Sequence, residues 1–266
     1  MICSICAIIK NEQLFLKEWI DWHLSIGFDY IFLCEDVGSL PHNEITDLYD
    51  NVKLFKYNEE ISKYENPYIG STHQYSYYMY FLNNYKDNIN NISWVAFIDI
   101  DEFIHIDNNL SIKELLSEYN EFNALYIYWK FFGADNHIKR PIGLVQENYT
   151  DQVEENDFDN GWRYKSIINF QIPFTFRQKL NVHDLVNNGV NSFKIPTHRI
   201  KTYHKIWINH YFTKSWEDWC ERFISKGDVA PGHRKLEDFF YLNKNMLSIK
   251  DQLMNFYEEK ITINRQ

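Results

Sequence analysis

Several features are scarce in this chain of 266 residues, and their scarcity excludes whole classes of protein. The four cysteines are scattered, which excludes the disulfide framework of a small secreted domain. Only six prolines and nine glycines occur, thinly spread, so there is no Pro/Gly-rich linker or low-complexity tract. No apolar run reaches the ~18–20 residues that are needed to span a bilayer.

Basic residues are also fewer than acidic ones. Lys and Arg total 27 against 37 Asp and Glu, a formal net charge of -10. A protein that binds duplexes broadly needs a basic face to displace counterions, so we predict no nucleic-acid polymer as partner. The first residues lack a charged start and a small-residue cleavage site, which predicts a soluble, cytoplasmic protein. The hydrophobic fraction of 45% excludes disorder and allows a substantial core.

Cys3 and Cys6 form a C-x-x-C in an apolar run that is typical of a strand. Residues three apart on a strand point to opposite faces, so these thiols are not placed to share a metal. We predict that they are core or near-core cysteines.

Apolar runs and helical periodicities alternate over the first 130 residues. We predict strands at 2–9, 30–34, 52–57, 94–100 and 124–131, and helices at 13–26, 71–85 and 110–119. Alternation with fully apolar strands indicates an α/β fold, with a mostly parallel sheet covered by helices on both faces.

The pattern is looser after residue 132. Strand-like pieces occur near 162–170, 172–177 and 203–212, and helical stretches at 215–226 and 234–257. We predict that residues 133–266 extend the domain begun by residues 1–132 and do not form an independent one.

Polar residues follow three of the predicted strands, in the places where ligands bind open α/β sheets. Asn11 and Glu12 follow the first strand, Asp36 the second, and Asp99 and Asp101 the fourth. Two aspartates two positions apart share a face of an extended segment, where they would repel unless a cation neutralised them. Carboxylate oxygens suit Mg²⁺ or Mn²⁺. The alternative is an ordinary acidic turn at a strand end.

Five segments in this order carry a resemblance to a known family. They are C-A-I-I-K-N-E with the E-W-I-D-W-H-L helix (6–29), F-I-D-I-D-E-F-I (97–104), W-K-F-F-G (129–133), K-S-I-I (165–168) and N-H-Y-F-T-K-S-W-E-D-W (209–219). Together they resemble glycosyltransferase family 92 and its bacterial family-2-like relatives over roughly residues 3–226. The resemblance implies a GT-A (Rossmann-like) fold, a nucleoside diphosphate sugar as donor, usually a UDP-sugar, and a divalent metal held by D-x-D.

The resemblance also implies roles for individual residues. Asn11 and Glu12 would face the nucleotide, Asp36 would lie near the base, Asp99 would approach the ribose and the metal, and Asp101 would ligate the metal directly. The loop after the second strand departs from the family pattern, which makes the base contact of Asp36 less specific. The resemblance further implies that residues 1–132 form the half that binds the nucleotide sugar and that residues 133–266 form the acceptor side.

The segment 209–219 offers two further candidates. His210 is a polar residue in an apolar row, and we predict it as a metal ligand, with His183 as second choice and a hydrogen-bonded core histidine as the alternative. Lys214 precedes an S-x-x-D helix start, where free N–H groups favour anions, so it is a candidate for the diphosphate. Its alternative is a solvated surface lysine. Lys165 is either a phosphate contact or a strand-edge surface lysine.

The catalytic base is less defined. Asp135 or His137 would take the proton from an acceptor hydroxyl, with Glu237 and Asp238 as rivals. His23 lies on the packed face of the first helix, and we predict a structural role that ties this helix to the sheet.

The sequence and the resemblance together predict a metal-dependent glycosyltransferase that moves a sugar to a glycan hydroxyl, and the resemblance implies that the transfer proceeds with inversion. The predicted acceptor is a growing surface glycan or a glycolipid, and a lipid-linked acceptor would bring a cytoplasmic enzyme to the inner face of the membrane. The alternatives are a catalytically silent sugar- or nucleotide-binding protein of the same fold, and a sugar nucleotidyltransferase. The second would need a Gly-rich phosphate loop after the first strand, and Lys10 to Gln13 is not one.

Overall fold

The computed structural model describes residues 1–66, 72–84, 92–107, 110–153, 164–172, 176–182, 184–186, 192–194, 205–222, 235–255 and 257. The chain forms two compact units. Unit 1 consists of Met1–Trp129 and Asn160–Asn209, and unit 2 of Lys130–Asp159 and His210–Gln266.

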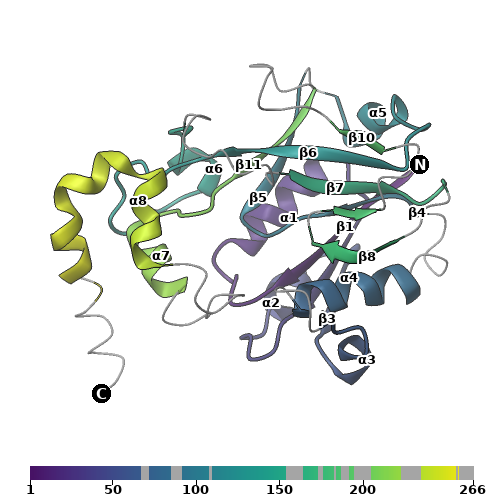
Figure 1. The fold of residues 1–266 in the computed structure, drawn as a ribbon, viewed down its shortest axis with the longest axis horizontal. Helices are drawn as coiled ribbons and strands as arrows, with labels where there is room; N and C mark the ends of the chain where they lie inside the picture. Colours follow the sequence, from purple (N-terminus) through teal and green to yellow (C-terminus); the bar gives the residue numbers. More distant parts are fainter. Residues whose placement is uncertain are drawn as a thin grey trace. The chain divides into compact units, whose positions relative to one another are not determined.

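A mixed sheet organises unit 1 (Figure 1), with the strand order β3-β2-β1-β4-β7-β6-β11-β5 and β10 beside β6. Its strands are β1 (Ile2–Ile9), β2 (Tyr30–Glu35), β3 (Val52–Lys56), β4 (Ile92–Phe97), β5 (Glu102–Ile106), β6 (Ala124–Phe131), β7 (Tyr164–Asn169), β10 (Ser192–Lys194) and β11 (Ile206–His210). Strands β3, β2, β1 and β4 run parallel, whereas β7 pairs antiparallel with β4 and β6. A separate pair, β8 (Phe176–Asn181) and β9 (Asp184–Val186), is antiparallel. The predicted mostly parallel sheet is confirmed.

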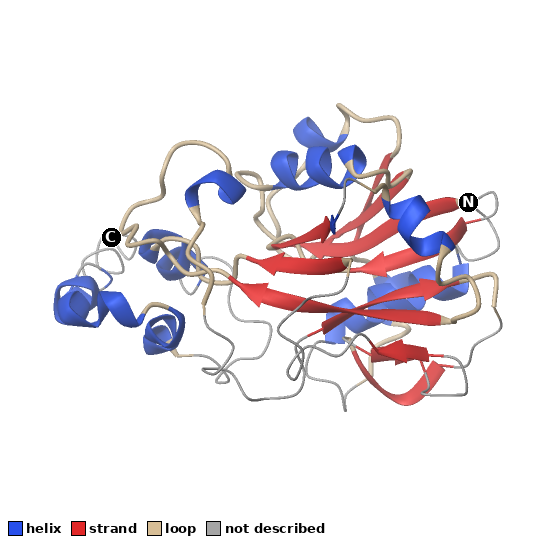
Figure 2. Ribbon diagram, turned by 90° about the horizontal axis from the view of Figure 1, so that it is seen from above, coloured by secondary structure: helices blue, strands red, loops and turns tan. Residues whose placement is uncertain are grey.

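Helices lie on both sides of this sheet (Figure 2). Helix α4 (Thr72–Asn84) packs the rings of Tyr77, Tyr78 and Phe81 into a cluster that includes Cys6 and Phe97. Helices α1 (Leu16–Ser25) and α5 (Ile112–Ser117), with the shorter α2 (Asn43–Thr46) and α3 (Glu59–Ser62), complete unit 1. The parallel strands β1, β2 and β4 are buried on both faces, which explains why they occur in the sequence as continuous apolar runs, whereas β3 has exposed Lys53 and Lys56.

The cysteines behave as predicted. Cys3 and Cys6 are both buried and carry free thiols, and only Cys6 belongs to the cluster under α4. The two side chains therefore lie on opposite faces of β1, and burial raises the pKa of the Cys3 thiol to about 12.

Two expectations need correction. The strand predicted over 94–100 ends at Phe97, and a strand that was not predicted, β5, begins at Glu102 after a turn at residues 100–101. The helix predicted over 234–257 is interrupted. It consists of the 3₁₀ turn η4 (Leu236–Asp238), α8 (Phe239–Leu242), the 3₁₀ segment η5 (Lys244–Ile249) and a helical stretch at 250–255. The buried Asn243, whose amide binds other backbone groups, lies at the break.

Unit 2 also contains α6 (Val145–Asn148) and α7 (Trp216–Glu221). Ser215 and Asp218 form the capping box of α7, as the S-x-x-D pattern predicts. The indole rings of Trp216 and Trp219 pack with Phe239 and Phe240 in the core of this unit.

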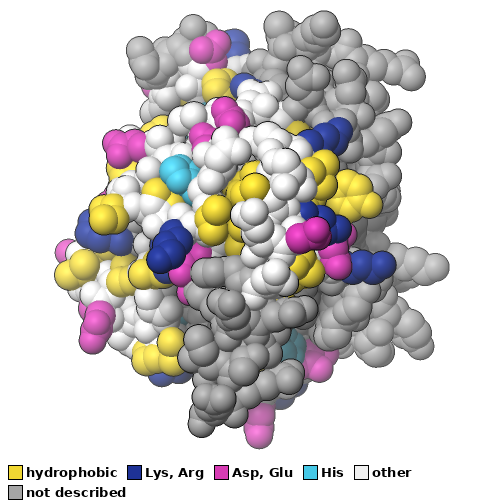
Figure 3. Space-filling view, turned by 90° about the vertical axis from the view of Figure 1, so that its left-hand side faces the viewer, with side chains coloured by type: hydrophobic (Ala, Val, Ile, Leu, Met, Phe, Trp, Pro, Cys, Tyr) yellow, Lys and Arg dark blue, Asp and Glu magenta, His cyan; other side chains and the backbone are white. Residues whose placement is uncertain are grey.

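Acidic and basic side chains are interspersed on the described surface shown in Figure 3.

Within the described residues, no helix combines the length and the apolar character that a bilayer crossing requires.

Candidate active site

The carboxylate of Asp99 is held from two sides just after β4. The Gln74 amide of α4 donates a hydrogen bond from Nε2 to Asp99 Oδ1 at 2.5 Å, and Lys165 of β7 donates from Nζ to Asp99 Oδ2 at 2.7 Å. Both oxygens therefore have fixed donors, and the carboxylate has one orientation. The pairing of β7 with β4 brings Lys165 to this place.

Lys165 is fully buried and faces a second carboxylate. Its Nζ lies 3.5 Å from Glu102 Oε1, and the side chains of Lys165 and Glu102 are both 0% exposed. Burial by itself lowers the pKa of Lys165, but Asp99 and Glu102 outweigh that effect and raise it, so the ammonium stays charged. Burial raises the pKa of Glu102 well above its usual value, against the lowering effect of Lys165. The predicted alternative of a strand-edge surface lysine is wrong, because β7 lies between β4 and β6.

Glu102 also shapes the turn that carries the two aspartates. Its Oε2 accepts a hydrogen bond from the backbone N–H of Asp99 at 3.0 Å. The indole N–H of Trp19 in α1 lies 3.1 Å from the carbonyl oxygen of Asp99 and 2.8 Å from that of Glu102. The turn between β4 and β5 is thus fixed from inside the protein, and the half-buried Asp101 lies within it.

A pair of carboxylates suited to a cation follows from this geometry. Asp101 and Glu102 each offer a carboxylate oxygen, and these two oxygens lie within 4.8 Å of each other. Glu102 Oε1 accepts no hydrogen bond in the described structure and has only the more distant ammonium of Lys165. Hard oxygen donors of this kind fit Mg²⁺ or Mn²⁺.

The end of β2 presents a second acidic group. His73 of α4 donates from Nδ1 to Asp36 Oδ1 at 2.6 Å, and Lys10 Nζ lies 3.7 Å from Asp36 Oδ2. The His73 ring lies against Tyr57, with ring centroids 4.4 Å apart. Asp36 is therefore held by His73 and lies near Lys10 just after the strand, and its place near a nucleotide base stays a prediction.

The end of β1 is tied to the loop after β2. Asn11 adopts φ +54°, a left-handed conformation that asparagine tolerates, and its Oδ1 accepts from the backbone N–H of Leu40 at 2.8 Å. The Glu12 backbone N–H donates to Nε2 of the buried His42 at 3.0 Å. His42 in turn donates from Nδ1 to Glu35 Oε1 at 3.0 Å. The loop after β2 is thus joined to the end of β1.

His23 has the predicted structural role. Its Nδ1 lies 2.8 Å from the carbonyl oxygen of Trp19 and its Nε2 accepts from the N–H of Ile104 in β5 at 3.2 Å. Only a neutral ring protonated at Nδ1 satisfies both contacts. The ring ties α1 to the sheet, and the prediction is confirmed.

Two predicted candidates lie at the start of the second segment of unit 2. His210 is 6% exposed, and its ring packs on Phe131 and Phe212. Lys214 is 5% exposed and adopts φ +52° immediately before the cap of α7. The alternative of a solvated surface lysine is wrong for Lys214. His183, the second choice for the metal, lies outside the described residues.

The candidate bases in unit 2 make structural hydrogen bonds. The Asp135 carboxylate accepts from the backbone N–H and the hydroxyl of Thr150, at 2.7 and 2.9 Å, and from the N–H of Asp151 at 3.0 Å. His137 Nε2 lies 3.2 Å from the carbonyl oxygen of Asn148. Among the rivals, Glu237 is exposed and Asp238 accepts from the N–H of Lys235. The base remains a prediction for all four.

Four residues of the site were not predicted from the sequence, namely His42, His73, Gln74 and Glu102. His73 and Gln74 are polar positions inside an aromatic helix, and no local pattern separates them from solvent-facing residues. Glu102 directly follows the D-x-D motif. Had the predicted strand ended before this motif and a new strand begun after Asp101, Glu102 would have been a candidate site residue.

Curated relatives match most of the chain. A protein of Oryza sativa subsp. japonica named a glycosyltransferase family 92 protein is 26% identical over 228 residues, and one of Arabidopsis thaliana with the same family name is 25% identical over 243. Each match covers 84% of this chain. The chain spans 35% and 37% of the lengths of these two relatives. No protein-family model matches the chain.

Solved structures are less similar to this chain in sequence than the curated relatives are. TarS from S. aureus (residues 1–349) is 13% identical, with a TM-score of 0.42 over 94% of this chain and 73% of that one. An active-site mutant of LgtC is 14% identical, with a TM-score of 0.31 over 63% of this chain and 57% of that one. The strand order, and not these scores, establishes the α/β class. The resemblance found in the sequence is confirmed by the curated relatives: over 84% of its length this chain is similar to proteins of glycosyltransferase family 92.

Proposed function

We propose that this chain is a metal-dependent glycosyltransferase of GT-A type. It transfers a sugar from a nucleoside diphosphate sugar, with UDP as the expected nucleotide, to a hydroxyl of a glycan acceptor. One observation supports this above the others: Asp101 and Glu102 offer paired carboxylate oxygens directly beside an Asp99 that Lys165 and Gln74 fix in place. The similarity to family 92 proteins agrees with this assignment.

The metal ligands proposed are Asp101, which lies in the turn between β4 and β5, with Asp99 and Glu102 beside it. We propose His210, at the end of β11, as a further ligand. When bound, Mn²⁺ or Mg²⁺ would offset the charge of the leaving diphosphate and orient it. Glu102 fits this role because it is a buried carboxylate with an oxygen that accepts no hydrogen bond from the described residues.

The donor would lie along the strand ends. Asn11 and Glu12 would border the nucleotide, and Asp36 would face the base beside the rings of Tyr57 and His73. Lys165 is fully buried, so it acts on the donor through Asp99 and does not reach a phosphate itself. Lys214, in a left-handed conformation before a helix start, remains the proposed cation for the diphosphate.

The reaction proposed is a direct displacement with inversion. An acceptor hydroxyl attacks the anomeric carbon, the bond from that carbon to the diphosphate oxygen breaks, and a base accepts the hydroxyl proton. Asp135 and His137 are the proposed bases. The acceptor would be a surface glycan or a lipid-linked oligosaccharide, reached from the cytoplasm at the inner face of the membrane.

Release of nucleoside diphosphate tests the proposal. The protein is incubated with a panel of sugar nucleotides, with Mn²⁺ and then with EDTA. We expect metal-dependent release of UDP from one donor, and its loss in Asp101→Asn. Asp47→Asn is the matched control, because Asp47 is an exposed aspartate of unit 1. Binding of a sugar nucleotide without any turnover would overturn the proposal in favour of a catalytically silent binding protein.

A further inference from the structure

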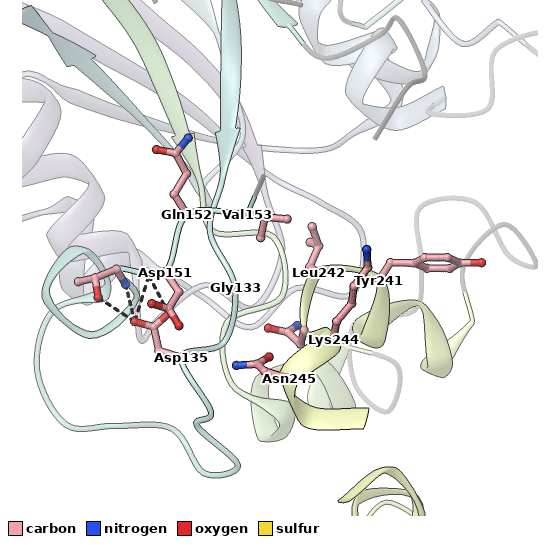
Figure 4. A pocket seen from close by; sticks show the side chains of 11 residues that line it. Gly133, Asp135, Asp151, Gln152, Val153, Tyr241, Leu242, Lys244 and Asn245 are labelled. Atoms are coloured by element: carbon pink, nitrogen blue, oxygen red, sulfur yellow. Dashed lines mark hydrogen bonds between the residues drawn. The ribbon is translucent and has the colours of Figure 1, made fainter. Parts of the chain in front are cut away.

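A polar pocket lies wholly within unit 2, and of its lining residues only Asp135, a candidate base, has been given a role above. Its volume is about 330 Å³, at the low end of the roughly 300–1,000 Å³ of ligand sites. Residues Gly133, Asp135 and Thr150 to Val153 form one wall, and residues 241–245 form the other. Figure 4 shows Asp135 and Asp151 on one side, facing the segment that carries Leu242, Lys244 and Asn245.

The floor of this pocket is held rigidly. Asp135 and Asn136 are consecutive residues at positive φ, +48° and +62°, in the left-handed region that Asp and Asn adopt more readily than other residues with a side chain. Asp135 binds the 150–151 backbone, and Asn136 Oδ1 accepts from Asn245 Nδ2 at 2.9 Å, which joins the two walls. Gly133 belongs here for a steric reason, since a Cβ at this position would lie 3.0 Å from Asn243 Oδ1.

Hydrogen-bonding capacity remains open on both walls. The exposed carboxylate of Asp151 and the exposed amide of Gln152 have no hydrogen-bond partner among the described residues. Asn245 uses its Nδ2 for Asn136, which leaves its Oδ1 as an acceptor. The pocket thus offers carboxylate and amide acceptors together with amide donors.

This chemistry selects the class of ligand. The lining carries two carboxylates, Asp135 and Asp151, against one ammonium, Lys244, so it repels phosphates and other anions. A lining that offers both acceptors and donors matches vicinal hydroxyl groups, each of which can accept and donate a hydrogen bond. Small volume, a rigid floor and mixed polar groups favour one ring of a neutral carbohydrate.

We propose that the pocket of unit 2 binds a neutral sugar residue of a glycan through Asp151, Gln152 and Asn245. The inference goes beyond the proposed transferase reaction, because the pocket would bind a glycan with no donor present.

Saturation-transfer NMR on the full chain, without nucleotide or metal, tests it. The probes are the methyl glycosides of glucose, galactose, mannose and N-acetylglucosamine, with inorganic phosphate as an anion. We expect saturation transfer to at least one glycoside, and binding weakened about fivefold or more by Asp151→Asn and by Gln152→Ala, since each removes about one hydrogen bond. Phosphate should not compete.

Matched controls exist in the same unit. Asp251→Asn and Gln252→Ala make the same chemical changes at exposed positions outside the pocket, and they should leave binding unchanged. Equal binding in all four variants, displacement by phosphate, or no binding of any glycoside would overturn the inference. Because the assay needs no donor, absence of UDP release alongside Asp151-dependent glycoside binding would refute the proposed function and leave this inference standing.

Discussion

Lys165 and Asp99 form an ion pair across the antiparallel pairing of β7 with β4, with Nζ and Oδ2 2.7 Å apart. The lysine is 0% exposed and the aspartate side chain 35% exposed, so one partner is fully desolvated while the other reaches the surface. An arrangement of this kind neutralises a carboxylate and at the same time fixes its direction.

Removing the lysine charge should therefore cost stability. Lys165→Met leaves Asp99 and the buried Glu102 without their cation, and loss of one partner of a buried pair costs about 3–5 kcal/mol. Lys205→Met is the control, because it breaks an exposed, solvent-screened pair with Glu118 that should contribute little to stability. Urea unfolding of the two variants measures the difference, and equal losses would contradict the prediction.

The two aspartates of the D-x-D motif should respond differently to substitution. Asp101→Asn should weaken Mn²⁺ binding by about tenfold or more, measured by calorimetry. Asp99→Asn should lower the unfolding free energy more than Asp101→Asn does, because it removes the negative charge that pairs with the buried Lys165 ammonium. Identical effects of the two variants on metal affinity and on stability would refute this division of roles.

His42 should stabilise the loop around the ends of β1 and β2. His42→Ala removes the acceptor of the Glu12 N–H and the donor to Glu35, which should cost about 1–3 kcal/mol. Gln13→Ala also loses contacts to this loop, but they are solvent-exposed, and its cost should stay within about 0.5 kcal/mol. A thermal melt of each variant gives the comparison. If His42→Ala is as stable as Gln13→Ala, the loop is held by other contacts.

The stability of the fold should fall with acid through His23. Burial lowers the pKa of His23 to about 3, whereas an unfolded histidine titrates near 6.5. Since the folded pKa is the lower one, the contribution is complete above pH 6.5 and is lost by up to ~1.4 kcal/mol per pH unit as the pH falls from 6.5 toward 3.

Urea unfolding of the native protein and of His23→Gln at pH 7, 6 and 5 checks this. The amide can still donate and accept hydrogen bonds but does not titrate, so the difference between the two proteins should shrink as the pH falls. A constant difference would show that His23 is not the titrating group.

Sequence patterns predicted the framework of unit 1 well because its strands β1, β2 and β4 are buried on both faces. An apolar run such as Ile2–Ile9 has few other interpretations, and the observed β1 has the same bounds. The motif around Asp99 was predictable because position after a strand is a local property. In both cases the information lies within about ten residues of sequence.

The partners of Asp99 were not predictable by the same means. Lys165 lies 66 residues away and reaches Asp99 only because β7 inserts antiparallel next to β4, and no local pattern encodes that sheet order. Gln74 is one polar residue among several in α4. The break at Asn243 is tertiary too, since its amide bonds to Ala134, which is 109 residues away.

The first turn of α4 has a geometric consequence. His73 and Gln74 are consecutive residues, yet His73 binds Asp36 after β2 and Gln74 binds Asp99 after β4. Because the backbone of a helical turn is rigid, this turn fixes the distance between the carboxylates of Asp36 and Asp99. Rotation or sliding of this helix would displace both carboxylates together, and a substitution that shifts one should be detectable at the other.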